Sequence, residues 1–256
     1  MKYYTPLQSL EDAVATISAE IMEEKKMVDD IVDLYKNAHT YTVEGNNGLV
    51  DSYQYFMYPF KGLTLVNSRL YRLLGKYMGH MIPKETEVIV TIEADGIGIA
   101  HFVGAEANIP VIISKHFHYN VDCIELVQHA GYHKRTMYLP KSVQGKKIAL
   151  VDCMVSTGGT MQALVGAIES LPGTQIMGIF VVNDKNNYRS TEKTLFGYPY
   201  KYLIDAKVDE AGKVQADWSI DLRTVFWEMM DTQFFSITEH CSQFSSVSKR
   251  GYQVGS

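Results

Sequence analysis

The spacing of apolar residues predicts that the chain opens with helical structure. Between residues 7 and 35 apolar side chains recur every three or four positions, on either side of the charged stretch Glu23-Glu24-Lys25-Lys26. We therefore expect one long or two short amphipathic helices over 7–35, whose apolar face suits either a dimer contact or a cover over the core. Residues 65–81 show the same spacing and form another predicted helix.

Apolar runs of another kind predict the strands. Residues 41–60 are aromatic and β-like around the turn signal Gly45-Asn46-Asn47-Gly48. Farther along, short continuous apolar runs are typical of strands buried in a parallel sheet, with one helix ending near residue 107 and another at 161–169. These runs lie at 87–92, 110–114, 148–151, 176–182 and 201–204.

The order strand, helix, strand implies right-handed βαβ units, so the predicted fold class is α/β. We expect a mainly parallel five-stranded sheet with flanking helices. The predicted parts are 1–85, with the first helices and the aromatic segment, 86–205, the core, and 206–256, a C-terminal extension with an amphipathic helix beginning at Asp221. A projecting hairpin is expected within 115–135.

Composition narrows the class of protein. A chain of 256 residues with 46% hydrophobic and 21% charged residues is long enough for one substantial core. The net charge of −5, without a basic block, argues against a nucleic-acid partner. With no apolar leader and no apolar run of about 18 residues, we expect no membrane contact and a cytoplasmic protein. Three distant cysteines, Cys123, Cys153 and Cys241, suggest neither a disulfide framework nor a zinc knuckle.

Residues 147–160 carry the strongest chemical signal. The apolar run of this stretch ends in Asp152, after which a turn rich in glycine and hydroxyl groups leads into a helix. Two glycines allow a tight turn, so that backbone N–H groups and the helix N-terminus converge on one point, and the hydroxyls add donors. The stretch therefore predicts an anion-binding cradle, although a generic turn between strand and helix has similar residue types. The cradle residues are Ser156, Thr157, Gly158, Gly159 and Thr160.

The same stretch resembles the phosphoribosyl diphosphate (PRPP) signature of the type I phosphoribosyltransferases. That signature has four hydrophobic residues, two acidic residues, two hydrophobic residues and then Ser/Thr-Thr-Gly-Gly-Thr. Twelve of its thirteen positions are met here, the exception being Cys153 in place of the second acid. In that family the turn holds the 5′-phosphate and the acidic pair faces the ribose hydroxyls. The resemblance covers roughly residues 86–205 and is best in the adenine phosphoribosyltransferase and purine-repressor branch.

The resemblance also assigns residues to the diphosphate of PRPP. Glu93-Ala94-Asp95-Gly96 matches the short pyrophosphate-binding loop of the family, with Asp95 in place of the usual basic residue. Lys115 matches the basic residue at the end of the next strand, and 116–134 matches the mobile catalytic loop. Lys134 and Arg135 are candidate diphosphate contacts, since cations balance the charge of the leaving group. All these loops follow strand ends, where parallel sheets bind ligands.

The implied reaction displaces pyrophosphate from C1 of PRPP by a purine-like base or another aromatic or heterocyclic acceptor, with Mg²⁺ as the cofactor. Asp152 is expected at the ribose hydroxyls and, through PRPP and water, near the metal. The expected catalytic residues are Asp152, Lys115 and Lys134. Homodimers are common in the family, and we expect one here.

The residues that contact the ribose and the acceptor are less well specified by the family motifs. The resemblance places Cys153 at the ribose, so either the ribose is held more weakly or Asn183 or Asp184 at the next strand end compensates for the missing acid. The sequence alone predicts that Cys153→Asp, which restores the motif, keeps or raises activity. Candidate acceptor contacts are Tyr58, Phe60 and Asn183, because flat aromatic rings can hold a planar base.

Four histidines lie in the polar stretch 115–135, at positions 116, 118, 129 and 133. Their spacing is compatible with metal ligands, but no Cys or Glu partner completes a set. Histidine in a polar loop is more often solvated or phosphate-facing. We therefore do not expect the histidines to form a metal site.

Three functions are open from the sequence. The first is a catalytic phosphoribosyltransferase, the second a PRPP-binding regulator or sensor without chemistry, and the third an interaction role for a degenerate domain. A DNA-binding repressor would need a basic N-terminal domain, and residues 1–40 are acidic. The intact Ser-Thr-Gly-Gly-Thr turn argues against a degenerate domain, and we favour the enzyme.

Overall fold

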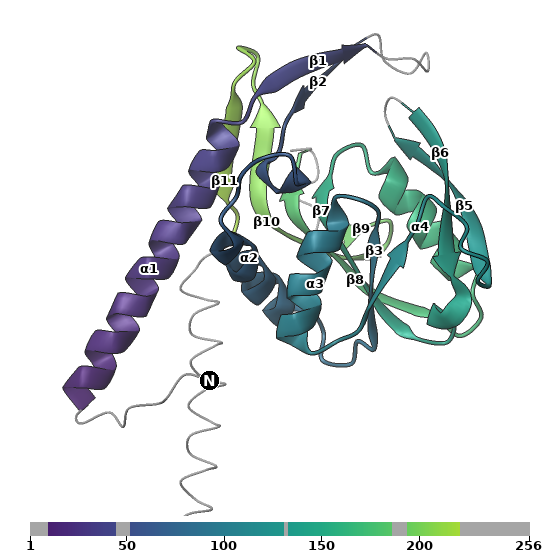
Figure 1. The fold of residues 1–256 in the computed structure, drawn as a ribbon, viewed down its shortest axis with the longest axis horizontal. Coiled ribbons are helices and arrows are strands. Elements are labelled where there is room, and N and C mark those ends of the chain that lie inside the picture. The colour runs from purple at the N-terminus through teal and green to yellow at the C-terminus, as the bar shows by residue number, and fades with distance from the viewer. Residues whose placement is uncertain (1–9, 45–51, 131–132, 186–193, 221–256) are drawn as a thin grey trace, which may run out of the picture. The chain divides into compact units, whose positions relative to one another are not determined.

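The computed structural model describes residues 10–44, 52–130, 133–185 and 194–220 (Figure 1). Its central sheet contains five parallel strands in the order β10-β8-β7-β3-β4. The predicted α/β fold with a mainly parallel sheet is confirmed, but the predicted number of five strands is wrong, because the sheet has seven within the described residues. The five parallel strands are β3 (Val88–Ile92), β4 (Val111–Ser114), β7 (Lys147–Val155), β8 (Gln175–Asp184) and β10 (Tyr198–Val208).

Two antiparallel strands, which the sequence did not predict, extend this sheet. β11 (Val214–Trp218) pairs with β10 at the edge, and the short β9 (Thr194–Leu195) pairs with the beginning of β10. The sheet therefore continues past residue 205 into the segment that we assigned to the extension. The division of the chain at residues 85 and 205 stays a prediction, and the helix expected from Asp221 lies outside the described residues.

Helices cover both faces of the sheet (Figure 1). On one face, α4 (Gly159–Glu169) and the hairpin of β5 (Cys123–Ala130) and β6 (His133–Pro140) share a buried cluster with strand residues such as Leu150. On the other face, α2 (Ser68–Met81) and α3 (Gly96–Ala107) pack together, and α3 lies close to Ile89 of β3. The expected hairpin is thus present, and the short turn η2 (Lys141–Val143) connects it to β7.

The N-terminal part contains one long helix, α1 (Leu10–Lys36), which contacts α2 and β11. The buried residues among the described side chains of α1 are Val28, Ile31, Val32 and Tyr35. A hairpin of β1 (Thr40–Glu44) and β2 (Ser52–Phe56) follows, and then the 3-10 turn η1 (Pro59–Lys61).

We call residues 52–61 the hood. The turn signal at 45–48 lies outside the described residues. Among the helices that the structure describes, none has the length and apolar character required to span a bilayer.

Candidate active site

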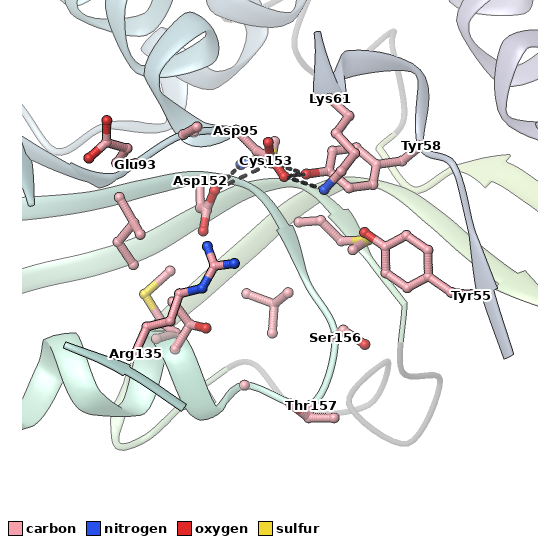
Figure 2. A pocket seen from close by; sticks show the side chains of 18 of the residues that line it. Tyr55, Tyr58, Lys61, Glu93, Asp95, Arg135, Asp152, Cys153, Ser156 and Thr157 are labelled. Carbon is pink, nitrogen blue, oxygen red and sulfur yellow. Dashed lines mark hydrogen bonds and ion pairs between the residues drawn. The ribbon is translucent and has the colours of Figure 1, made fainter. Parts of the chain in front are cut away.

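The parallel strands end at a cavity of about 430 Å³ (Figure 2). Its wall is formed by the hood, the loop between β3 and α3, the turn between β7 and α4, and residues after β4 and in β6. The loops at 93–96 and 152–160 thus meet at the carboxyl ends of the strands. The polar and aromatic lining residues are Tyr55, Tyr58, Lys61, Glu93, Asp95, His116, Arg135, Asp152, Ser156, Thr157 and Thr160.

The turn after β7 has the geometry of an anion cradle. Gly158 has a φ of 85°, in the left-handed region that glycine adopts without steric cost, and α4 begins at the next residue. Ser156, Thr157 and Thr160 line the cavity around this turn. A helix N-terminus beside several hydroxyl groups is well suited to binding a phosphate.

Asp152, in the C-terminal half of β7, provides a carboxylate to the cavity wall. Its Oδ1 accepts a hydrogen bond from the backbone N–H of Cys153 at 2.7 Å. Burial raises the pKa of Asp152 to about 7, although this hydrogen bond acts in the opposite direction. A cation or a hydroxyl donor brought into the cavity would favour the ionised form, so the charge of Asp152 depends on what is bound.

The loop between β3 and α3 is joined to the end of β4 through Glu93. The Glu93 carboxylate accepts a hydrogen bond from the backbone N–H of His116 at 3.0 Å and pairs with Lys115 Nζ at 3.3 Å. The hydrogen bond from His116 and the Lys115 cation hold the pKa of Glu93 below its usual value. The peptide bond between Glu93 and Ala94 is cis. Through its contacts with Lys115 and His116, the Glu93 side chain connects the loop after β3 to the residues after β4.

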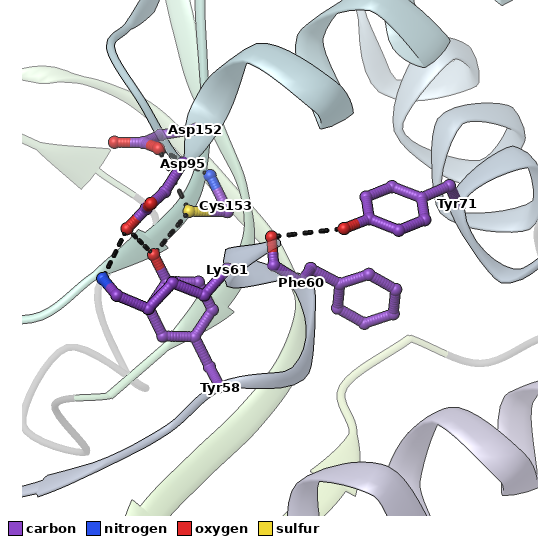
Figure 3. Close-up of polar contacts among 7 residues, drawn as sticks. All are labelled: Tyr58, Phe60, Lys61, Tyr71, Asp95, Asp152 and Cys153. Carbon is purple, nitrogen blue, oxygen red and sulfur yellow. Dashed lines mark hydrogen bonds and ion pairs between the residues drawn. The ribbon is translucent and has the colours of Figure 1, made fainter. Parts of the chain in front are cut away.

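Asp95 connects the same loop to the hood (Figure 3). Its Oδ2 accepts hydrogen bonds from the Tyr58 hydroxyl and from Lys61 Nζ, the latter at 2.7 Å. On its other side, the Tyr58 oxygen lies 3.3 Å from Cys153 Sγ, which donates to it. Burial raises the pKa of both Tyr58 and Cys153, so both groups keep their protons. A single hydroxyl therefore bridges the loop between β3 and α3 and the strand β7.

Known proteins are similar to this chain in sequence and in fold. No protein-family model matches the chain. The hypoxanthine/guanine phosphoribosyltransferase of Methanococcus maripaludis strain C5 is 33% identical over 165 residues, which are 64% of this chain and 88% of the relative. The enzyme of the same name from Methanothermococcus okinawensis is 35% identical over 165 residues, covering 63% and 88%. The chain belongs to the type I phosphoribosyltransferase family.

A solved structure shows the same fold. The adenine phosphoribosyltransferase of Rhodothermus marinus superposes on this phosphoribosyltransferase with a TM-score of 0.52 at 15% sequence identity. The match covers 70% of this chain and 97% of that enzyme. At this level of identity the likeness concerns the fold alone.

The predicted basic residues of this phosphoribosyltransferase lie in different settings. Arg135 lines the cavity (Figure 2), as does His116 from the predicted mobile loop. Lys115 contacts Glu93, and only its neighbour His116 belongs to the lining. The side chain of Lys134 lies outside what the structure describes. The proposed roles of these residues stay predictions.

The candidate acceptor residues separate into two groups. Tyr58 lines the cavity, whereas Phe60 and Asn183 do not belong to its lining. Phe60 is buried and its ring packs against Tyr71 and Tyr35. Asn183 is fully buried, and its amide donates to the carbonyl oxygens of Asp184 and Ile204, so it connects neighbouring strands.

Several lining residues of the phosphoribosyltransferase were missed as site residues from sequence, and the polar or aromatic ones among them are Tyr55, Lys61 and His116. Tyr55 belongs to the aromatic run from Tyr53 to Phe60, in which no spacing distinguished lining residues from packed ones. Lys61 follows this run directly. A cation next to an aromatic segment was the only signal available for it.

Proposed function

We propose that this chain transfers the 5-phosphoribosyl group of PRPP to a ring nitrogen of a purine base, with release of pyrophosphate. The 6-oxopurines hypoxanthine and guanine are the first bases to consider. The observation that carries the proposal is the identity of 33% and 35% to two hypoxanthine/guanine phosphoribosyltransferases over 88% of their lengths. The cavity agrees with it, since the cradle and Asp152 line one space.

In the proposed reaction the bond between C1 and the diphosphate oxygen breaks as the bond from C1 to the ring nitrogen forms. Positive charge develops on the ribose ring and negative charge on the departing pyrophosphate. The cradle, by holding the 5′-phosphate, fixes the position of C1 relative to the acceptor. Asp152 accepts hydrogen bonds from the ribose hydroxyls, and its negative charge stabilises the positive ring. The proton of the acceptor nitrogen passes to solvent.

The diphosphate would lie against the loop that begins at Glu93. Backbone N–H groups of this loop supply donors, while the Glu93 side chain is engaged with Lys115 and His116. Arg135, which lines the same cavity, supplies a cation for the leaving group. Charge neutralisation at this end lowers the barrier to departure of the pyrophosphate.

The aromatic hood residues supply a surface for the base. Tyr55 and Tyr58 both line the cavity, and their ring centroids are 6.4 Å apart at an interplanar angle of 65°. Aromatic faces bind planar heterocycles by stacking. The pocket also has to exclude water, because water would otherwise capture C1 of PRPP.

Mg²⁺ fits the residues present as a cofactor held mainly by its substrate. Among the described residues no group of three or more His, Cys, Asp or Glu side chains could hold a metal ion, and Asp152 is the carboxylate at the strand end. Such a donor set suits a cation that keeps several waters and the oxygens of PRPP. When bound, Mg²⁺ would neutralise the charge of the diphosphate. Asp152 would accept hydrogen bonds from the waters of the ion.

We also propose that the enzyme is a cytoplasmic homodimer. PRPP is made inside cells, so the cytoplasm is where the substrate is available. On α1, Met22 is 73% exposed and Ile21 39% exposed, and Leu63 next to the hood is 71% exposed. Apolar side chains in such positions can be covered by a second copy of the chain. Light scattering of the wild type and of Met22→Lys would test this dimer.

Steady-state assays of pyrophosphate release would test the function. The purified chain would be mixed with PRPP, Mg²⁺ and, one at a time, hypoxanthine, guanine, xanthine and adenine. We expect release with hypoxanthine or guanine and formation of the matching nucleotide. Gly158→Ala, purified in the same way, would control for host enzymes. PRPP binding without turnover for any purine would favour the regulator instead, and no PRPP binding at all would refute the proposal.

A further inference from the structure

The loop 93–96 of this chain carries an acidic residue, Asp95, where the family motif that the loop resembles has a basic one, and this acidic residue forms an ion pair with Lys61. Here the Asp95 carboxylate pairs with Lys61 of the hood at 2.7 Å (Figure 3). The side chains of Lys61 and Asp95 are 23% and 30% exposed, so the pair is largely shielded from solvent. A shielded pair at a cavity wall holds both charges in fixed positions.

The second departure from the family motifs lies in the same cluster. Cys153 occupies the position of the second acid of the signature and is 2% exposed. Its Sγ lies 3.3 Å from the Tyr58 oxygen, and the Tyr58 hydroxyl donates to Asp95. The side chains at positions 153 and 95 therefore contact the same group, the Tyr58 hydroxyl. The two motif changes are joined by one tyrosine.

Comparing charges shows what the two changes do together. The family pattern places one positive charge at position 95 and one negative charge at position 153, which cancel. This chain places a negative charge at position 95, none at 153 and a positive charge at Lys61, which also cancel. Compared with the family pattern, the acidic residue of this chain lies in the loop instead of the strand, and the basic residue lies in the hood instead of the loop.

We propose that Lys61 binds the diphosphate of PRPP and takes the place of the basic residue that the loop lacks. The inference rests on the proposed function, because it assigns a residue to the same substrate. Lys61 lines the cavity together with the loop 93–96 and Arg135. A lysine ammonium has three N–H donors and can serve several acceptors at once, so the Asp95 contact is compatible with a bound phosphate.

The fold holds Lys61 in place from the protein side. Lys61 ends the 3-10 turn η1, whose Phe60 carbonyl oxygen accepts a hydrogen bond from the Tyr71 hydroxyl of α2 at 3.4 Å. The ammonium lies 5.1 Å from the centre of the Tyr58 ring, a cation–π distance. Asp95 therefore acts as a positioning residue for Lys61.

This arrangement links the two substrates. The hood carries both Lys61, assigned to PRPP, and the tyrosines Tyr55 and Tyr58, assigned to the base. Displacement of the hood would remove the diphosphate cation and the stacking surface together.

Three variants test the assignment. Lys61→Met removes the charge and keeps much of the length, Lys61→Arg keeps the charge, and Lys76→Met is the matched control. Lys76 also pairs with a carboxylate, that of Glu24, and its side chain is 27% exposed, but it does not belong to the cavity lining. The KM values for PRPP and for the purine would be measured separately, with calorimetry of PRPP binding and thermal unfolding of each variant.

We expect Lys61→Met to raise the KM and Kd for PRPP about 10- to 100-fold, as for loss of a charged hydrogen bond, with a smaller change in the KM for the purine. Lys61→Arg, which keeps the charge, should recover most of this loss, and the control Lys76→Met should stay within about threefold of the wild type for PRPP, a change worth under 1 kcal/mol. A folded Lys61→Met protein with wild-type PRPP affinity would overturn the assignment and leave the proposed function standing. The same holds if only the KM for the purine rises. Failure of the proposed function would instead appear in the wild type, as absence of turnover.

Discussion

Gly96 lies against the carboxylate of Asp152. A β-carbon added at residue 96 would come within 2.8 Å of Asp152 Oδ1 and would also contact Thr91 Oγ1. This approach brings the loop between β3 and α3 next to the end of β7, so the two loops can share one substrate. The glycine of the Glu-Ala-Asp-Gly loop thus has a packing reason that the sequence could not show.

Gly96→Ala should displace the loop from Asp152. Because neither Asp152 nor Thr91 can move without disturbing a strand end, we expect a loss of stability of about 1–3 kcal/mol and a KM for PRPP raised at least about tenfold. Gly98→Ala is the control, since its β-carbon would meet Tyr71 at 3.5 Å, an ordinary contact. Urea unfolding and steady-state kinetics of both variants would check this. Equal behaviour of the two variants would contradict the close approach.

Asp152→Asn should stabilise the ligand-free protein while weakening PRPP binding. The pKa of Asp152 is raised from 3.8 to about 7 in the folded state by burial. The unfolded carboxyl ionises near pH 4, while the folded one keeps its proton until about pH 7, so ionisation opposes folding. The wild type therefore loses stability as pH rises from 4 to 7, and the neutral asparagine does not.

The expected gain of Asp152→Asn is at most about 4 kcal/mol above pH 7 and close to zero at pH 4. Denaturant unfolding at several pH values, without Mg²⁺ and PRPP, would measure it. A variant less stable than the wild type at pH 8 would show that the carboxylate is not desolvated. Calorimetry with PRPP would give the accompanying loss of affinity.

The strands of the core were predictable because buried parallel strands are continuous apolar runs. Ile148 to Val151 is such a run, and it lies in β7 as expected. β11 was missed because it is short and alternates apolar and polar residues, and it is held by pairing with β10. A pattern of that kind is too weak to distinguish an edge strand from a loop.

The site was predictable where a local motif specifies it. Asp152 and the cradle residues Ser156, Thr157, Gly158 and Thr160 lie close together in sequence, and they line one cavity. The contacts among Lys61, Asp95 and Cys153 join residues far apart in the chain, and only folding brings them together. Asp95 and Cys153 therefore looked like two separate losses in the sequence, whereas in the structure they belong to one cluster.

Gly158→Ala should disable the phosphate cradle more than it disturbs the fold. At a φ of 85° an alanine is strained by roughly 1–2 kcal/mol, and relief of the strain moves the N–H groups of the turn. We expect PRPP affinity to fall at least about 30-fold. Gly166→Ala in the same helix is the control, because its β-carbon would meet nothing within 4 Å and alanine favours helix.

Gly166→Ala should leave kinetics unchanged and raise stability by up to about 1 kcal/mol. Calorimetric titration with PRPP and thermal unfolding of both glycine variants would separate loss of binding from loss of folding. If Gly158→Ala bound PRPP as the wild type does, the turn would not be the phosphate site.

Cys153→Asp restores the signature but should lower both stability and activity, so the structure reverses the expectation from sequence. The new carboxylate would be buried near Asp95 and next to Asp152, with Tyr58 already donating to Asp95. Like charges in a buried site repel and cost several kcal/mol unless a cation joins them. A cation at position 95 is what the family pattern supplies.

Cys153→Asp combined with Asp95→Arg should therefore recover much of what each single variant loses. Both single variants leave a buried charge without its partner, and the double variant recreates the pair. We expect a coupling free energy of about 1–3 kcal/mol between positions 95 and 153, from unfolding of the four proteins of the cycle. The KM for PRPP should follow the same order. Additive effects would mean that the two positions do not interact, and the cluster around Tyr58 would then have no energetic role.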